Sequence, residues 1–350
     1  MDLSFFKGKK ILVTGHTGFK GSWMCQVLKM QGADVTGFAL EPPTRPSIFS
    51  LAHVHEDMVS VTGDIRDGEK VTDIFKKYKP EIVIHMAAQP IVRESYETPV
   101  YTYETNVMGT VNVLEAARQC GSVRSLVNVT TDKVYRNNEW EWGYRETDEL
   151  DGYDPYSNSK SCSELVTFAY RRSFFQDEDT AISTCRAGNV IGGGDFARDR
   201  IIPDCVRAQE KGEKITVRNP YSTRPYQHVL EPVCAYLKLA EAQYLDRKGY
   251  EGSYNVGPDD CDCVTTGELV DIFCRLWGDN ASWEDVSEKN APHEAGFLKL
   301  DCSKIKRAMG WDPKWHIEET VEKAVAWSKA YINGEDMAAE TEREIKEYLK

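Results

Sequence analysis

The sequence predicts an α/β protein, in which a doubly wound parallel sheet is joined to a smaller, mixed C-terminal domain. Short apolar runs alternate with helical patterns as far as Arg186, which is typical of a parallel sheet with helical crossovers. The first of these runs leads into a glycine-rich turn and then a helix. Beyond Arg186 the alternation gives way to shorter, mixed elements, and 350 residues are enough for two domains.

The composition excludes several classes of protein. A hydrophobic fraction of 41% and a charged fraction of 28% are typical of a soluble globular chain. The formal net charge of -13 argues against nucleic acid as the main partner, because a backbone binder needs a basic surface. No apolar run reaches eighteen residues, so we expect no membrane span, and the N-terminus lacks the apolar core of a signal peptide.

The cysteines and histidines do not form a recognisable metal motif. The ten cysteines are scattered, and Cys261-Asp262-Cys263 lacks the spacing of common zinc sites. This pattern predicts reduced thiols in a cytoplasmic protein. His53 and His55 are interpreted as part of a polar loop, so no metal site is expected.

The glycine turn follows a buried strand, Lys9–Thr14, and precedes a helical pattern that runs to Met30. Its spacing is G-x-x-G-x-x-G. In this position glycines let the backbone approach a pyrophosphate, and the helix N-terminus supplies amide donors. The context favours a dinucleotide-binding Rossmann domain over a plain strand-to-helix turn. The turn residues assigned to the cofactor are Gly15, Thr17, Gly18, Phe19, Lys20 and Gly21.

The next two strands bear on the adenosine half of the cofactor. The second strand, Val35–Leu40, lacks the acid that usually binds the adenosine ribose, and Glu41 comes slightly late. Arg45 nearby leaves NADP open as an alternative to NAD. The third strand, Val59–Thr62, is followed by Asp64 and Ile65, which could hold the adenine, although a plain turn fits almost as well.

The fourth strand, Glu81–Met86, ends in small residues that leave room for a ligand in the crevice beyond the sheet; tight packing under a helix is the alternative. A long helix is predicted over Val100–Gln119. The residues assigned to the cofactor in these two segments are Ala87, Ala88, Gln89 and Asn106.

Tyr156 and Lys160 lie four residues apart in a predicted helix, so both can face one site. A nearby cation favours the phenolate and would let such a tyrosine exchange protons near neutral pH. An exposed helix face is the alternative for an isolated Tyr-x-x-x-Lys, but the upstream glycine turn favours the catalytic interpretation. The preceding strand, Ser125–Thr130, ends in the polar cluster Thr131-Asp132-Lys133.

The second half supports a division into two domains. A Rossmann domain is predicted for residues 1–188, with 226–256 returning to it, and a substrate domain for 189–225 and 257–350. A strand is predicted at Phe297–Leu300, and the charged segment from Glu335 to Lys350 is predicted to be an exposed helix. Further elements are expected at Ala181–Cys185, Ile201–Lys211, Ile215–Arg218, Val229–Leu245, Ser253–Val256, Thr266–Trp277, Ser303–Met309 and Ile317–Ile332.

Taken together, the motifs have the order found in extended short-chain dehydrogenases/reductases. Within that group the chain resembles the sugar-nucleotide dehydratases, most closely those that act on CDP-glucose, from about Lys9 to about Trp327. The motifs that carry the resemblance are Gly15–Gly21, Gly63-Asp64-Ile65, His85–Ala88, Thr131, Tyr156-x-x-x-Lys160, Arg186–Val190 and Arg224–Val229.

The resemblance implies a lyase that removes water from CDP-glucose with bound NAD reduced and reoxidised in each turnover. Tyr156 would remove the O4 proton, Lys160 would hold the ribose, and Thr131 would bind O4. Asp132 matches the acid for the departing C6 hydroxyl. Lys133 replaces the glutamate that serves as C5 base in the dTDP-glucose enzymes, so the identity of the C5 base stays open.

The resemblance also implies the substrate contacts and the assembly. Gln89, Asn189, Arg218, Arg224 and His293 match substrate-binding positions, although Arg218 could equally be a surface cation and His293 a loop residue. A homodimer is expected through the Val100–Gln119 helix and the Tyr156 helix. The apolar contacts expected there are Phe168, Tyr170 and Phe174.

Two alternatives remain at this point. A sugar-nucleotide 4-epimerase, or a dehydratase acting on another sugar nucleotide, would share most of these motifs. An epimerase needs no acid for a leaving hydroxyl, so Thr131-Asp132-Lys133 argues against it. A dinucleotide-binding protein without catalysis would not need the intact Tyr156 and Lys160.

Overall fold

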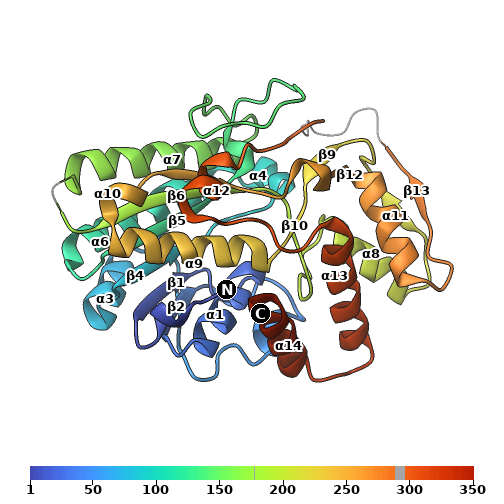
Figure 1. The fold of residues 1–350 in the computed structure, drawn as a ribbon, viewed down its shortest axis with the longest axis horizontal. Coiled ribbons are helices and arrows are strands. Elements are labelled where there is room, and N and C mark those ends of the chain that lie inside the picture. Colours follow the sequence, from blue (N-terminus) through green and yellow to red (C-terminus); the bar gives the residue numbers. More distant parts are fainter. Residues whose placement is uncertain (177, 288–295) are drawn as a thin grey trace.

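A computed structural model describes residues 1–176, 178–287 and 296–350 (Figure 1). Its centre is a seven-stranded sheet with the order β11-β6-β5-β4-β1-β2-β3, in which every neighbouring pair is parallel. The strands are β1 (Lys10–Thr14), β2 (Asp34–Ala39), β3 (Val59–Thr62), β4 (Ile82–His85), β5 (Ser125–Thr131), β6 (Ala181–Ala187) and β11 (Ser253–Val256). The predicted doubly wound parallel sheet is therefore confirmed.

Helices cover both faces of this sheet, and the alternation along β1 shows why. Ile11 and Val13 enter the core beneath α1 (Phe19–Met30) and α9 (Leu230–Leu245), whereas Leu12 enters the core on the other face. That second face is covered by α3 (Gly68–Tyr78), α6 (Gly109–Cys120) and α7 (Pro155–Phe174). Figure 1 shows α7 and α9 on opposite sides of the sheet.

The order of strands reverses between β1 and β4. The chain leaves β1 toward β2 and β3 on one side and continues from β4 toward β5 and β6 on the other. Ligands of doubly wound sheets bind at such a point, beyond the carboxyl ends of the strands. The glycine turn after β1 and the small residues after β4 both lie there.

The helix predicted over Val100–Gln119 is helical but not uniform. It consists of α5 (Pro99–Tyr103), a π-helical turn η2 (Glu104–Met108) and α6. A π turn inserts one extra residue into the helix and is frequent at functional sites. Here the turn contains Asn106, one of the residues assigned to the cofactor.

The second half has a core of its own, formed by α8 (Ile201–Glu210), β8 (Ile215–Val217), α11 (Thr266–Trp277) and one face of α13 (Ile317–Ile332). Helix α9 and strand β11 return to the first core. Three further pairings involve β9 (Thr223–Pro225) with β12 (Cys263–Thr265), β8 with β13 (Trp283–Asp285) and β7 (Val190–Ile191) with β10 (Gln227–His228). The remaining short elements are η1 (Ser4–Phe6), α2 (Ile48–Leu51), α4 (Val92–Glu97), η3 (Asp132–Val134), α10 (Arg247–Tyr250), η4 (Asp260–Asp262) and α12 (Ser303–Met309).

Two predictions for the C-terminal part are wrong. Helix α14 (Met337–Leu349) is not an exposed helix, because Met337, Ile345 and Tyr348 are buried in the same core as α1 and α9. Its outer face carries the charges that suggested exposure. The predicted strand at Phe297–Leu300 is reduced to two isolated bridges, Phe297 with Thr223 and Leu300 with Tyr144.

All ten cysteines lie in the described ranges, and all are free thiols. Across the described part of the chain, no helix has both the length and the apolar character needed to span a membrane.

Candidate active site

The glycine turn after β1 is held in a conformation that only glycines allow. Gly15 has φ +76, and a Cβ there would lie 2.8 Å from the backbone nitrogen of Ala87 at the end of β4. A Cβ on Gly21 would lie 2.1 Å from the carbonyl oxygen of Gly15. The two strand ends and the start of α1 therefore approach one another more closely than a side chain would permit.

The start of α1 is suited to a bound pyrophosphate. Its N-cap, Gly18, makes no side-chain capping bond within the described structure, so the first amides of α1 remain available as donors. Thr17 donates from Oγ1 to the carbonyl of Leu40 at 2.8 Å and ties the turn to the end of β2. The donor set and the close backbone approach fit the phosphates of a dinucleotide.

The π turn connects the end of β4 to α7. The Asn106 amide accepts from the backbone nitrogen of Gln89 at 2.9 Å and donates to the Gln89 carbonyl at 3.1 Å. It also donates to Oγ of Ser159 at 2.9 Å. The Gln89 side chain donates from Nε2 to Oγ1 of Thr102 at 3.0 Å and is buried. In the described structure Asn106 and Gln89 thus build the wall of the site, and Ala87 and Ala88 lie half-buried beside them.

Local capping explains why Tyr156 stands in the first turn of α7. Asp154 is the N-cap and accepts from the Ser157 backbone nitrogen at 3.0 Å, and Pro155 occupies the first helical position. The Tyr156 side chain is buried. Its hydroxyl lies near Thr131, at the carboxyl end of β5.

The acid–base pattern around Tyr156 differs from the expectation. Burial raises the pKa of Tyr156 to about 12, and the nearby Thr131 hydroxyl and the charge of Arg200 only partly oppose this. The Lys160 ammonium donates to the carbonyl of Val129 at 3.2 Å, and burial lowers the pKa of Lys160 to about 8. These directions run against the prediction that Lys160 brings Tyr156 close to neutral titration, because desolvation of the phenol outweighs the effect of an ammonium that donates to Val129.

Thr131, Asp132 and Lys133 lie together at the end of β5. Thr131 donates from Oγ1 to Oδ1 of Asp132 at 2.9 Å, and Lys133 Nζ lies 3.5 Å from the same oxygen. Asp132 is fully buried, and its Oδ2 has no hydrogen-bond partner among the residues that the structure describes. Lys133 Nζ also donates to Oδ1 of Asn189 at 3.4 Å, which brings a predicted substrate residue to the catalytic cluster.

Two further cations, Lys20 and Arg200, lie near this cluster. Lys20, at the start of α1, has its pKa lowered to about 7 by burial and by the charges of Arg200 and Lys160. Its ammonium lies over the ring of Tyr236 at 5.7 Å. Arg200 precedes α8, pairs with Asp195 at 3.1 Å and acts on the pKa of both Lys20 and Tyr156.

Sequence reasoning assigned Lys20 to the cofactor but missed Arg200 and Tyr236. No local pattern marks either residue, since one lies in a loop and the other inside an apolar helix. Only the packing of α9 and of the loop before α8 brings them to Tyr156.

A buried ion pair supports the floor of the site. Arg186 on β6 and Glu164 on α7 are both fully buried, with Nη2 and Oε2 2.9 Å apart. Arg186 also donates to the hydroxyl of Tyr135 at 2.8 Å, just after η3. Glu164 accepts from Thr184 Oγ1 at 2.7 Å. The pair thus joins α7, which carries Tyr156 and Lys160, to the strand beside Thr131.

Asp64 lies beyond β3, but its carboxylate is already engaged. Arg66 donates from Nε and Nη2 to Oδ2 of Asp64 at 2.9 and 2.7 Å, and from Nη1 to Glu104 at 3.1 Å. Burial acts against ionisation, but the Arg66 hydrogen bonds prevail and hold the pKa of Asp64 below its usual value. Ile65 is buried beside it.

The remaining predicted substrate residues are less close together. Arg218, at the end of β8, donates to Asp199 at 2.6 Å and is partly exposed. Arg224, on β9, is buried and donates to the carbonyl of Thr223 at 3.0 Å. Asp199 immediately precedes Arg200 in the sequence. Arg218 is therefore bound to the same loop that carries Arg200. His293 lies outside the described residues.

Comparison with known proteins agrees with this geometry. The family model described as GDP-mannose 4,6 dehydratase matches residues 12–324. The chain is 50% identical to the CDP-glucose 4,6-dehydratase of Salmonella typhimurium, with 100% of this chain and 98% of the relative covered. It is 27% identical to the CDP-paratose 2-epimerase of Salmonella typhi over 92% of this chain and 99% of that one.

Solved structures share the fold at low sequence identity. The dTDP-glucose 4,6-dehydratase of Bacillus anthracis, in complex with NAD, has a TM-score of 0.77 at 22% identity, covering 95% of this chain and all of that one. MoeE5 in complex with UDP-glucose and NAD has a TM-score of 0.79 at 22% identity, covering 92% and 99%. With a family model that spans most of the chain and a full-length relative at 50% identity, this protein belongs to the GDP-mannose 4,6-dehydratase family of extended short-chain dehydrogenases/reductases.

Proposed function

We propose that this protein is an NAD-dependent CDP-glucose 4,6-dehydratase, a lyase for deoxysugar biosynthesis. It removes water from CDP-D-glucose and yields CDP-4-dehydro-6-deoxy-D-glucose. The observation that carries this function is the 50% identity, over the whole chain, to a relative of that name. The assembled cluster of Tyr156, Thr131, Asp132 and Lys133 supports it chemically.

Each group has a role that its position permits. Bound NAD would supply the hydride chemistry, with transfer from C4 of the sugar and return to C6. Tyr156 takes the O4 proton, and Thr131 hydrogen-bonds O4. Lys160 holds the nicotinamide ribose. Asp132 protonates the departing C6 hydroxyl through Oδ2, which has no hydrogen-bond partner among the described residues.

Loss of the C6 hydroxyl also requires a base for the C5 proton. Lys133 Nζ lies between Asp132 Oδ1 at 3.5 Å and Asn189 Oδ1 at 3.4 Å, within the same cluster. A lysine accepts a proton only in its neutral form. We assign the C5 base to Lys133 as part of this proposal, with Lys133→Met as its test: loss of solvent exchange at C5 supports the role, and retained exchange contradicts it.

The other predicted contacts are proposed as follows. The glycine turn, Asp64, Ile65, Ala87, Ala88, Gln89 and Asn106 surround the cofactor. Asn189, Arg218 and Arg224 bind the sugar pyrophosphate, for which an arginine fork is well suited. His293, the remaining predicted substrate contact, lies outside the described residues.

The assignment of NAD rather than NADP has support in the structure. Glu41 follows β2 and accepts from Thr62 Oγ1 at 3.0 Å, so a carboxylate does lie near the expected ribose position. Arg66 is engaged by Asp64 and Glu104 rather than free for a 2′-phosphate. Competition titration of the two dinucleotides tests this, and markedly tighter NADP binding would overturn it and implicate the exposed Arg45.

A homodimer through α5–α6 and α7 is also proposed. Large apolar side chains are exposed on both surfaces, among them Val100 at 69%, Met108 at 51% and Leu165 at 53%. Phe174 is exposed as expected, whereas Phe168 and Tyr170 are half-buried within the subunit. Sedimentation of wild type and Leu165→Glu tests the interface: a dimer that becomes monomeric supports it, and a wild-type monomer at micromolar concentration contradicts it.

A cytoplasmic location belongs to the same proposal, because ten free thiols suit a reducing compartment.

One experiment separates the proposed function from its alternatives. Incubation with CDP-glucose should give a product lighter by one water. An unchanged mass with inverted C4 would support the epimerase instead. Reaction only with another sugar nucleotide would move the substrate assignment, and no reaction with any sugar nucleotide would favour a binding protein.

A further inference from the structure

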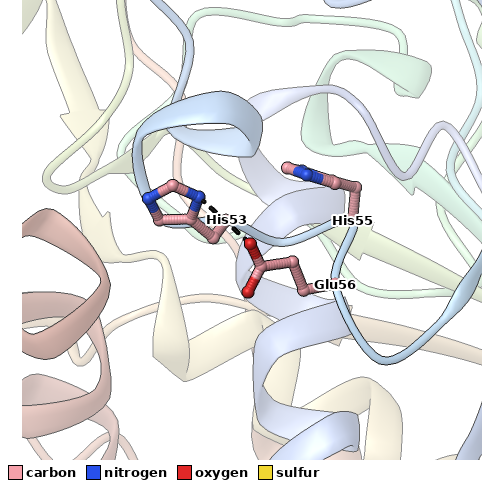
Figure 2. A group of neighbouring side chains, drawn as sticks. All are labelled: His53, His55 and Glu56. Carbon is pink, nitrogen blue, oxygen red and sulfur yellow. Dashed lines mark ion pairs between the residues drawn. The ribbon is translucent and has the colours of Figure 1, made fainter.

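A group of potential metal ligands lies in the loop between α2 and β3, away from the elements that carry Tyr156 and Lys160. His53, His55 and Glu56 are all exposed, and their ligand atoms lie within 4.8 Å of one another. Figure 2 shows the two imidazoles and the carboxylate grouped on the outside of this loop. His53 Nδ1 and Glu56 Oε1 are 3.4 Å apart.

These distances suit a first-row divalent transition metal. Zinc binds imidazole nitrogen at about 2.0–2.1 Å and carboxylate oxygen at about 2.0–2.2 Å, so two ligands of one tetrahedral ion lie roughly 3.3–3.5 Å apart. The His53–Glu56 pair already has this separation. The His55 side chain needs only a small movement, which its exposure permits. Two imidazoles and one carboxylate leave a fourth position for water.

The backbone that carries these side chains is held by the rest of the fold. Lys29, at the end of α1, donates from Nζ to the carbonyls of Val54 and Glu56 at 3.0 and 2.7 Å. Val54 lies between the two histidines in the sequence, and its side chain is fully buried. The side chains of His53 and His55, on either side of it, are exposed. His53 itself has φ +48, a left-handed conformation that costs free energy for a residue with a side chain.

We propose that His53, His55 and Glu56 form a binding site for one divalent transition-metal ion such as Zn²⁺. The sequence pattern alone predicts only a polar loop for the two histidines. The fold adds a carboxylate at ligand distance from His53 and a backbone held from α1, which are the features that a preformed site requires. The site is independent of the proposed dehydratase activity.

A second group in the described structure, Cys261, Asp262 and His316, provides the matched control. There the carboxylate of Asp262 is already engaged, since Oδ2 lies 2.8 Å from His316 Nδ1 and Oδ1 accepts from the Ile317 backbone nitrogen at 3.0 Å. Asp262 thereby holds the start of α13. This second group also contains the thiol of Cys261. A cobalt ion bound to a thiolate has a different visible spectrum from one bound only to nitrogen and oxygen.

The test is calorimetric titration of chelator-treated, metal-free protein with ZnCl₂. Wild type and His316→Ala should each bind one equivalent at the loop. His53→Ala and His55→Ala should each lower the Zn²⁺ affinity by at least about 10-fold. Even mutation of residues that only hydrogen-bond to metal ligands lowers metal affinity by roughly 10–100-fold. Circular dichroism would verify that each exposed-loop variant is folded. Co²⁺ should give visible bands without a thiolate charge-transfer band.

Three outcomes would overturn the proposal. The first is that wild type binds no Zn²⁺ at millimolar concentration. The second is that His53→Ala and His55→Ala, verified as folded, both retain the wild-type affinity. The third is that His316→Ala abolishes binding while both loop variants retain it, which would place the ion at Cys261 and Asp262.

Discussion

At the scale of single residues, the site depends on how burial sets the protonation of Tyr156, Lys160 and Lys20. Burial raises the pKa of the tyrosine and lowers the pKa of both lysines. Desolvation always disfavours the charged form, so it acts in opposite directions on acids and bases. The pKa shifts therefore favour the neutral phenol of Tyr156 and the neutral amines of Lys20 and Lys160. Anionic and cationic groups of bound ligands would change that balance.

The first prediction separates oxidation from elimination. Tyr156→Phe removes the proposed O4 base and should abolish NADH absorbance with CDP-glucose. Asp132→Asn keeps the shape of the side chain but lacks an acidic proton, so NADH should appear transiently while dehydration slows by about 10²–10⁴. Stopped-flow absorbance with product analysis measures both steps. Dehydration by Asp132→Asn at the wild-type rate would show that Asp132 is not the acid.

The second prediction concerns proton uptake on NAD binding. The pKa of Lys20 is lowered to about 7 and that of Lys160 to about 8, so at pH 8 Lys20 is mostly neutral and Lys160 is partly neutral. A nearby anionic pyrophosphate favours the charged amine and should raise both values. Binding at pH 8 should therefore take up protons, and the uptake should decline toward pH 6.

Calorimetry in buffers of different ionisation enthalpy gives the number of protons bound. Lys20→Met should take up fewer protons at pH 8 than wild type. Equal uptake by the two proteins would mean that Lys20 does not titrate with the ligand.

At the scale of elements, α7 is held against β6 by Glu164 and Arg186. The pair is fully buried, and both partners make further hydrogen bonds to Thr184 and Tyr135. Because α7 carries Tyr156 and β6 is paired with β5, which carries Thr131, this contact holds α7 against the strand next to Thr131. The α5–η2–α6 segment contributes in the same way through Asn106 and Gln89.

The third prediction tests this contact. Glu164→Gln leaves the Arg186 charge buried without its counter-ion, which should reduce the free energy of unfolding by roughly 3–5 kcal/mol. Glu318→Gln, in the exposed pair with Arg275, is the matched control and should cost at most about 1 kcal/mol. Urea unfolding measures both. Similar losses in the two variants would contradict a special contribution from the buried pair.

At the scale of the whole molecule, the two halves have separate hydrophobic cores, and the C-terminal helices contribute to both of them. The C-terminal helix α14 packs in the same core as α1 and α9, and one face of α13 packs in the second core.

Two buried histidines lie in the first half of the chain. Burial lowers the pKa of His85 to about 3 and that of His16 to about 4. His85 is fully enclosed between Thr14 and Thr110.

The fourth prediction follows from these histidines. Unfolded histidines gain protons below about pH 6.5, whereas folded His85 stays neutral until about pH 3 and His16 until about pH 4. Between those limits the unfolded state binds more protons, so stability should fall with decreasing pH. Each histidine contributes about 1.4 kcal/mol per pH unit to that slope.

Urea unfolding at pH 7 and pH 5 should therefore show a smaller difference for His85→Gln than for wild type. His55→Gln, at an exposed histidine, should keep the wild-type difference. A wild-type difference in His85→Gln would show that His85 does not carry this dependence.

The sequence by itself determined the elements whose cause is local. Apolar periodicity predicted the parallel strands, and the glycine spacing predicted the turn, because Gly15 and Gly21 meet backbone that excludes any Cβ. The spacing of Tyr156 and Lys160 placed both on one helix. The resemblance then predicted the family correctly, since its motifs keep their order along the chain.

Only the tertiary structure decided what depends on contacts between distant segments. It directed the Lys160 ammonium to Val129, brought Arg200 beside Tyr156, and paired Asp64 with Arg66. It also buried Ile345 on a helix whose charges suggested exposure. The physical reason is that periodicity reports which face of an element is apolar, whereas a pKa, an ion pair or a buried face depends on which other elements desolvate it.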